Sequence, residues 1–110
     1  MKRNMVKKGD SGMISLIRNP NTGLTKICVS CHAEVALSGV RALFGGSEGQ
    51  AIKLVQSYEV NDARNEKKIL LRHLLEITPQ GKTYALRSTD WFRLTDKELA
   101  EIDSYMDEDI

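Results

Sequence analysis

Two short β-prone segments separated by turn-forming residues constrain the fold of this chain more than any other feature. The segments are "MISLI" (residues 13–17) and "LTKICVS" (residues 24–30), and the sequence between them includes "RNPNTG". In this linker Pro20 fixes one backbone φ angle, and Gly23 accepts a positive φ. The combination is typical of an antiparallel hairpin with a loop of about five residues.

The hydrophobic patterns after the hairpin predict mostly helices. Residues 33–44 carry apolar side chains at helical spacing and are followed by two glycines, whereas residues 51–60 alternate as a half-buried strand does. Thr95 can cap a last helix, and Asn61 or Asp62 can cap the helix before it. The predicted elements are a helix over 33–44, a loop over 46–50, a strand over 51–60, a helix over 63–76, a short strand over 83–88 and a helix over 95–106.

The order β-β-α-β-α-(β)-α predicts an α+β fold, in which helices flank a small mixed or antiparallel sheet. The chain of 110 residues is long enough for one compact domain and too short for two. Hydrophobic residues make up 41% of it and charged residues 28%, a balance typical of a globular protein without long disordered segments.

The formal net charge of +1 does not by itself indicate nucleic-acid binding, but the charges are unevenly distributed. Basic residues gather at the start and acidic residues at the end: Lys2, Arg3, Lys7 and Lys8, then Glu101, Asp103, Asp107, Glu108 and Asp109. We expect residues 1–10 to form a flexible basic lead-in and residues 107–110 an acidic tail. Such ends are usually solvated, and some contact partners.

No apolar run approaches the ~18 residues that a membrane span requires. The basic start of the chain is not followed by an apolar segment, so it does not have the pattern of a signal peptide. We therefore expect a cytoplasmic protein without a membrane partner.

The segment "CVSCH" (residues 28–32) has three interpretations: a c-type haem attachment site, part of a zinc site, or two thiols at a strand. Covalent haem attachment and a disulfide both require an oxidising or exported compartment, so we expect neither. Zinc requires four ligands, and the only candidates are Cys28, Cys31, His32 and His73. Because His32 adjoins Cys31, we disfavour zinc and expect Cys28 to lie within the second strand, facing away from Ile27.

Glu66 is the first candidate functional residue. It lies between Ile69 and Leu70 around the predicted helix 63–76, on an otherwise apolar arc. A carboxylate in that position costs free energy unless it is paired or binds a cation. A metal ion and a neighbouring lysine are both possible partners.

Basic residues cluster on the same helix and beyond it: Arg64, Lys67, Lys68 and Arg72, then Lys82, Arg87 and Arg93. Charged helical faces are usually just solvated, but next to a buried acid they can hold a phosphate backbone near a metal ion. Trp91 and Phe92 form an aromatic pair that we expect to anchor the last helix in the core, with base stacking as the alternative.

Four sequence blocks, in this order, resemble the GIY-YIG endonuclease superfamily and its small phage-type single-domain branch. "GMISLIRNP" and "GLTKICVS" are similar to the paired signature strands, and "LVQSYEVNDARNEKKILLRHL" to the next strand and the helix with a single glutamate. "DWFRLTDKELAEI" resembles the closing aromatic block and last helix. The resemblance covers about residues 12–106 and implies a GIY-YIG-like domain over residues 11–106.

The resemblance implies a metal-dependent phosphodiester hydrolase that uses Mg²⁺ or Mn²⁺. Glu66 matches the metal-binding glutamate, and Arg41 lies on the helix that carries the catalytic arginine, although it is displaced along that helix. Ser15 stands where the family has its first signature tyrosine, and Cys28 stands at a signature glycine. Leu70 occupies a position one turn after the glutamate that is often histidine in this branch.

Because the tyrosine is replaced and the arginine displaced, the sequence favours a degenerate domain that binds nucleic acid without cleaving it. DNA or RNA would bind weakly and independently of sequence through Arg64, Lys67, Lys68 and Arg72. Two alternatives stay open. One is a metal-dependent DNA endonuclease that uses Glu66, and the other is a phage or mobile-element protein that binds and inhibits a host protein.

Overall fold

The computed structural model describes residues 6–77 and 91–108 of the chain. Its strands are β1 (Gly12–Asn19), β2 (Leu24–Ser30), β3 (Lys53–Val60) and β4 (Trp91–Phe92), and its helices are α1 (Ala33–Phe44), α2 (Gly46–Ala51), α3 (Ala63–Ile77) and α5 (Asp96–Glu108). The predicted α+β class is confirmed. The short strand expected over 83–88 lies outside the described residues.

The four strands form one antiparallel sheet in the order β3-β1-β2-β4. The predicted hairpin is confirmed as β1 and β2, with Ser15 opposite Cys28 in its register. The turn is closed by Asn19, whose side-chain Oδ1 accepts the Asn21 N–H at 2.9 Å and whose backbone carbonyl accepts the Gly23 N–H at 2.8 Å. Gly23 has φ 76°, a left-handed conformation that favours glycine.

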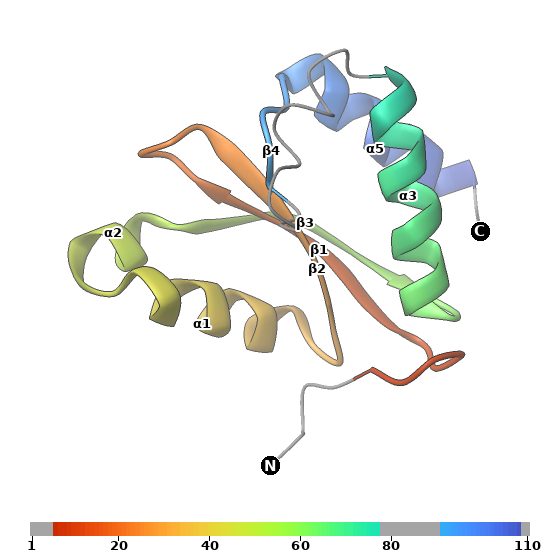
Figure 1. Cartoon of the computed structure of the whole chain (residues 1–110), viewed down its shortest axis with the longest axis horizontal. Coiled ribbons are helices and arrows are strands. Elements are labelled where there is room, and N and C mark those ends of the chain that lie inside the picture. The colour runs from red at the N-terminus through yellow and green to blue at the C-terminus, as the bar shows by residue number, and fades with distance from the viewer. Residues whose placement is uncertain (1–5, 78–90, 109–110) are drawn as a thin grey trace.

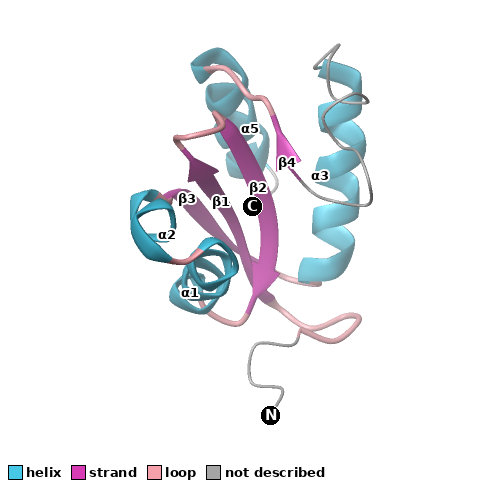
Figure 2. Ribbon diagram, turned by 60° about the vertical axis from the view of Figure 1, so that its left-hand side comes forward, coloured by secondary structure: helices cyan, strands magenta, loops and turns pink. Residues whose placement is uncertain are grey.

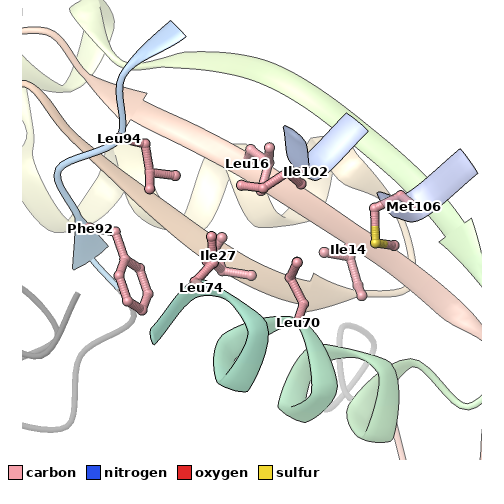
Figure 3. Packing of buried hydrophobic residues seen from close by; sticks show 9 residues of the cluster. All are labelled: Ile14, Leu16, Ile27, Leu70, Leu74, Phe92, Leu94, Ile102 and Met106. Atoms are coloured by element: carbon pink, nitrogen blue, oxygen red, sulfur yellow. The ribbon is translucent and has the colours of Figure 1, made fainter. Parts of the chain in front are cut away.

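Helices lie on both faces of the sheet (Figures 1 and 2). α3 and α5 cover one face, which we call the α3/α5 face. α1 covers the opposite face, with α2 beside the end of α1, and we call this the α1/α2 face. The buried cluster on the α3/α5 face contains Ile14, Leu16, Ile27, Leu70, Leu74, Phe92, Leu94, Ile102 and Met106 (Figure 3). A separate, smaller cluster of Ile17, Val40 and Ile52 lies between α1 and the sheet.

Two elements differ from the sequence-based expectations. The segment 46–50, expected to be a loop, is most of α2, and the following strand starts at Lys53. A Cβ atom at Gly49 would lie 2.6 Å from the Arg41 carbonyl oxygen, so the glycine that suggests a loop allows α2 to approach α1. β4 was not expected as a strand, and it consists of two residues that pair with Thr25 and Lys26 of β2.

Residues 6–10, expected as part of a flexible lead-in, contact the start of α3. Val6 is 9% exposed, and the Gly9 N–H donates to the Asp62 carboxylate at 3.2 Å. The backbone carbonyl of Asp10 accepts the Ala63 N–H at 2.8 Å, which satisfies one of the free donors at the start of this helix.

The cap predicted for the last helix is confirmed. The Glu98 N–H donates to Thr95 Oγ1 at 3.1 Å, and the Thr95 N–H donates to Glu98 Oε1 at 2.8 Å. This reciprocal pair is a capping box.

Candidate nucleic-acid interface

α3 presents opposite chemical characters on its two sides. Ala63, Leu70 and Leu74 are fully buried toward the sheet. Arg64, Lys68 and Arg72 are exposed, and their spacing of four residues places them in one row along the solvent side. We call these three residues the α3 basic stripe. Lys67, the fourth predicted contact, is half-buried at the border of the apolar side.

Glu66 is half-buried and lies at the edge of the apolar arc rather than in its centre. Of its two neighbours on the helix, Leu70 is fully buried and Ile69 is 37% exposed. By helical geometry Glu66 shares its side of α3 with His73, whose ring stacks on Tyr105 of α5 with centroids 4.6 Å apart. Glu66 therefore lies on the flank of α3 that turns toward α5.

Arg41 takes part in a structural contact on the other face of the sheet. Its guanidinium Nε and Nη2 both donate to the backbone carbonyl of Ile52, at 3.2 and 3.0 Å. This carbonyl lies at the junction of α2 and β3, so the arginine ties the end of α1 to that junction. The structure does not bring Arg41 and Glu66 together, because the sheet lies between their helices (Figures 1 and 2).

Ser15, which the sequence resemblance places at a signature tyrosine, is inaccessible to solvent. Its exposed fraction is 0%, and it lies in the middle of the sheet between Cys28 of β2 and Ser57 of β3. In the described part of the chain its hydroxyl has no hydrogen-bond partner. A hydroxyl enclosed in this way cannot contact a substrate in solution without a rearrangement of the domain.

The "CVSCH" segment lies where the sequence indicated. Cys28 is within β2 and packs against the small cluster on the α1/α2 face, whereas Ile27 belongs to the opposite core. His32 is exposed at the residue before α1. Among the residues that the structure describes, no three His, Cys, Asp or Glu side chains gather as a metal site would require. Within the same residues, no helix has both the length and the apolar character needed to cross a membrane.

The aromatic pair is divided between the two faces. Phe92 is 2% exposed in the core beneath α3 and α5, as expected for an anchor of the last helix. Trp91 packs on the other face, where its ring and the ring of Phe44 are edge-to-face with centroids 5.9 Å apart. The Lys26 ammonium lies 5.7 Å from the centroid of the Trp91 ring.

A second cationic group, which the sequence did not single out, lies at the start of β3. Arg18 of β1 is directly opposite Lys53 of β3 in the antiparallel register. The two residues are far apart along the chain, so only the pairing of β1 with β3 reveals them as neighbours. Only the register between β1 and β3 could have revealed this pair. A tight turn fixes the register of a hairpin, but β1 and β3 are separated by two helices, so the sequence gives no such signal for them.

Comparisons with known proteins do not assign this domain to a class: no protein-family model, curated protein or solved structure matches the chain.

Proposed function

We propose that this chain is a degenerate GIY-YIG-like domain that binds DNA or RNA without cleaving it. The observation that carries the proposal is the α3 basic stripe, three exposed cations in one row on the helix side opposite the core. At 1.5 Å per residue, the stripe is about 12 Å long, which is enough to reach at least three successive phosphates of one strand at a spacing of about 3.4 Å along the duplex axis. Its charges act over a Debye length of ~8 Å at physiological salt, so the near-zero net charge of the chain does not cancel them.

Three residues that the resemblance relates to the family's catalytic groups, with Arg41 displaced from its expected position, support binding over cleavage. The hydroxyl at Ser15 is enclosed in the sheet, and the Arg41 guanidinium is bonded to the Ile52 carbonyl. Glu66 lies on a helix across the sheet from Arg41. Loss of one group that stabilises a transition state typically costs ~10²–10³ in rate, so two such losses leave little catalysis.

A salt titration of a short duplex and of a single strand tests this proposal. For three phosphate contacts, log affinity should fall with log salt with a slope of about −2.7 on the duplex. The variant Lys68→Glu/Arg72→Glu should lose most of this slope and bind much more weakly at low salt. The matched control Lys53→Glu reverses one exposed charge away from α3 and should keep the wild-type slope.

Two outcomes would contradict the proposal. If wild type binds neither duplex nor single strand at low salt, or if the α3 variant binds as well as wild type, the protein-binding alternative replaces it. Circular dichroism of each variant verifies that a loss of binding is not a loss of folding.

The endonuclease alternative has a separate test. We expect no cleavage of duplex or single-stranded DNA in Mg²⁺ or Mn²⁺. Cleavage that requires either ion and is abolished by Glu66→Ala, but retained by Lys53→Glu, would instead establish the metal-dependent nuclease.

A further inference from the structure

Arg18 and Lys53 form an unusual pair of like charges directly opposite each other across β1 and β3. Arg18 is half-buried and Lys53 is exposed. Like charges in this position are destabilising, and no carboxylate in the described part of the chain forms an ion pair with either. The isolated domain therefore tolerates a local concentration of positive charge that an acidic partner would relieve.

The pair borders a hollow with an apolar wall. Arg18, Pro20, Lys53, Leu54 and Val55 line this hollow, which has a volume of about 390 Å³ and which we call the β3 hollow. Leu54 and Val55 are 37% and 40% exposed, so two large apolar side chains lie open to solvent beside two cations. None of the described residues that line it is acidic.

The backbone around the β3 hollow limits the way in which a partner can bind. Among the described strands β3 lies at the edge of the sheet, but its register against β1 shifts between Leu16 and Ile17, which leaves Val55 as an extra residue in a bulge. The Ser57 N–H is bonded to the Gln56 side-chain oxygen at 3.0 Å. Bulges and occupied donors oppose the addition of a long strand, so recognition at this edge relies on side chains over a short segment.

We infer that the β3 hollow binds a short segment of a partner protein in which a carboxylate lies next to a large apolar side chain. The carboxylate would pair with Arg18 and Lys53, and the apolar side chain would cover Leu54 and Val55. A phosphodiester backbone matches only the charges, because it has no apolar group for these two residues. This site is separate from the α3 basic stripe, because the start of β3 lies next to α2 whereas α3 follows the far end of β3 (Figure 1).

The test is an NMR titration of ¹⁵N-labelled full chain with eight-residue peptides that contain Glu-Leu pairs. Matched peptides carry Lys in place of Glu, or Ser in place of Leu, and oligothymidine serves as the phosphate probe. Glu-Leu peptides should shift the amides of Arg18 and Lys53–Val55, and each peptide substitution should weaken binding about fivefold to tenfold. Oligothymidine should act on α3 amides instead.

Variants of the protein complete the test. Lys53→Glu should lower the affinity for the Glu-Leu peptide about tenfold. The same variant should raise the melting temperature by about 1–5 °C, because it relieves the repulsion with Arg18. The matched control Lys68→Glu should leave peptide binding unchanged. The inference is wrong if no Glu-Leu peptide shifts these amides at millimolar concentration, if Ser-substituted peptides bind equally well, or if Lys53→Glu binds as wild type does.

Discussion

The two faces of the sheet are stabilised by different means. On the α3/α5 face, nine described residues form one buried apolar cluster that includes side chains from β1, β2, α3, β4 and α5 (Figure 3). On the α1/α2 face the buried apolar cluster comprises Ile17, Val40 and Ile52. Because apolar burial contributes roughly 25 cal/mol per Å², the first face provides most of the hydrophobic stabilisation of the domain.

Polar and close backbone contacts hold the second face. The Arg41 guanidinium donates twice to the Ile52 carbonyl, and the fully buried Asn19 donates from Nδ2 to the Glu48 carboxylate at 3.1 Å. Leu43 of α1 is 76% exposed and adds little apolar burial to this face. The comparison teaches that Arg41, a catalytic candidate in the sequence analysis, makes a structural contact on the face that depends on such contacts.

Matched truncations on one strand give the largest expected effects. Ile14 and Ile17 are both 0% exposed in β1, but they face the large and the small cluster respectively. Ile14→Ala should lower the free energy of unfolding by about 4–5 kcal/mol, and Ile17→Ala by about 2–3 kcal/mol. The difference is expected because a cavity in the smaller cluster can collapse more readily. Urea denaturation monitored by circular dichroism measures both, and an equal or reversed cost would contradict the comparison.

A pair of glycine substitutions tests whether close backbone approach holds α2 on α1. Gly49→Ala places a Cβ 2.6 Å from the Arg41 carbonyl oxygen and should cost about 1–3 kcal/mol. Gly39→Ala lies in the interior of α1, where the new Cβ meets no described atom within 4 Å apart from the adjacent backbone of its own helix, and it should stabilise the domain by about 0.5–1 kcal/mol. Thermal denaturation distinguishes the two signs, and a neutral Gly49→Ala would show that this contact is not required.

Removal of the guanidinium tests the structural role of Arg41. Arg41→Met keeps much of the aliphatic side chain but loses both hydrogen bonds to Ile52, which should cost about 0.5–1.5 kcal/mol because the arginine is solvent-exposed. The salt dependence of nucleic-acid binding should not change. A stable variant with weakened binding would instead assign Arg41 to a ligand site.

The smallest effect concerns alkaline pH on the α3/α5 face. The Tyr58 hydroxyl donates to Asp103 at 2.9 Å, and burial, this hydrogen bond and the nearby carboxylates of Asp103 and Asp107 raise its pKa above the ordinary value. Because the pKa is raised in the folded state, the contribution of Tyr58 to the free energy of unfolding is complete below about pH 10. This contribution is lost as the pH rises further. Tyr58→Phe should therefore decline in stability less steeply than wild type above pH 10, as pH-dependent urea denaturation measures. Parallel declines would exclude this linkage.

The elements specified by local signals were predictable. The hairpin follows from its turn residues, α1 matches its predicted bounds, and Thr95 forms the expected cap. α2 was missed because a segment with two glycines has low helix propensity, and only its contact with α1 makes the helix favourable. β4 was missed because two residues carry no periodicity and are a strand only through their pairing with β2.

For the candidate interface, the sequence by itself determined that Arg64, Lys68 and Arg72 share one side of α3, because the period of a helix is independent of its surroundings. Only the tertiary structure decided that Arg41 and Glu66 lie across the sheet from each other, that Ser15 is enclosed, and that Arg18 meets Lys53. Those relationships depend on which face each helix covers and on the register between strands distant in sequence. Both are selected by the burial of apolar surface over the whole chain, which no local pattern of residues encodes.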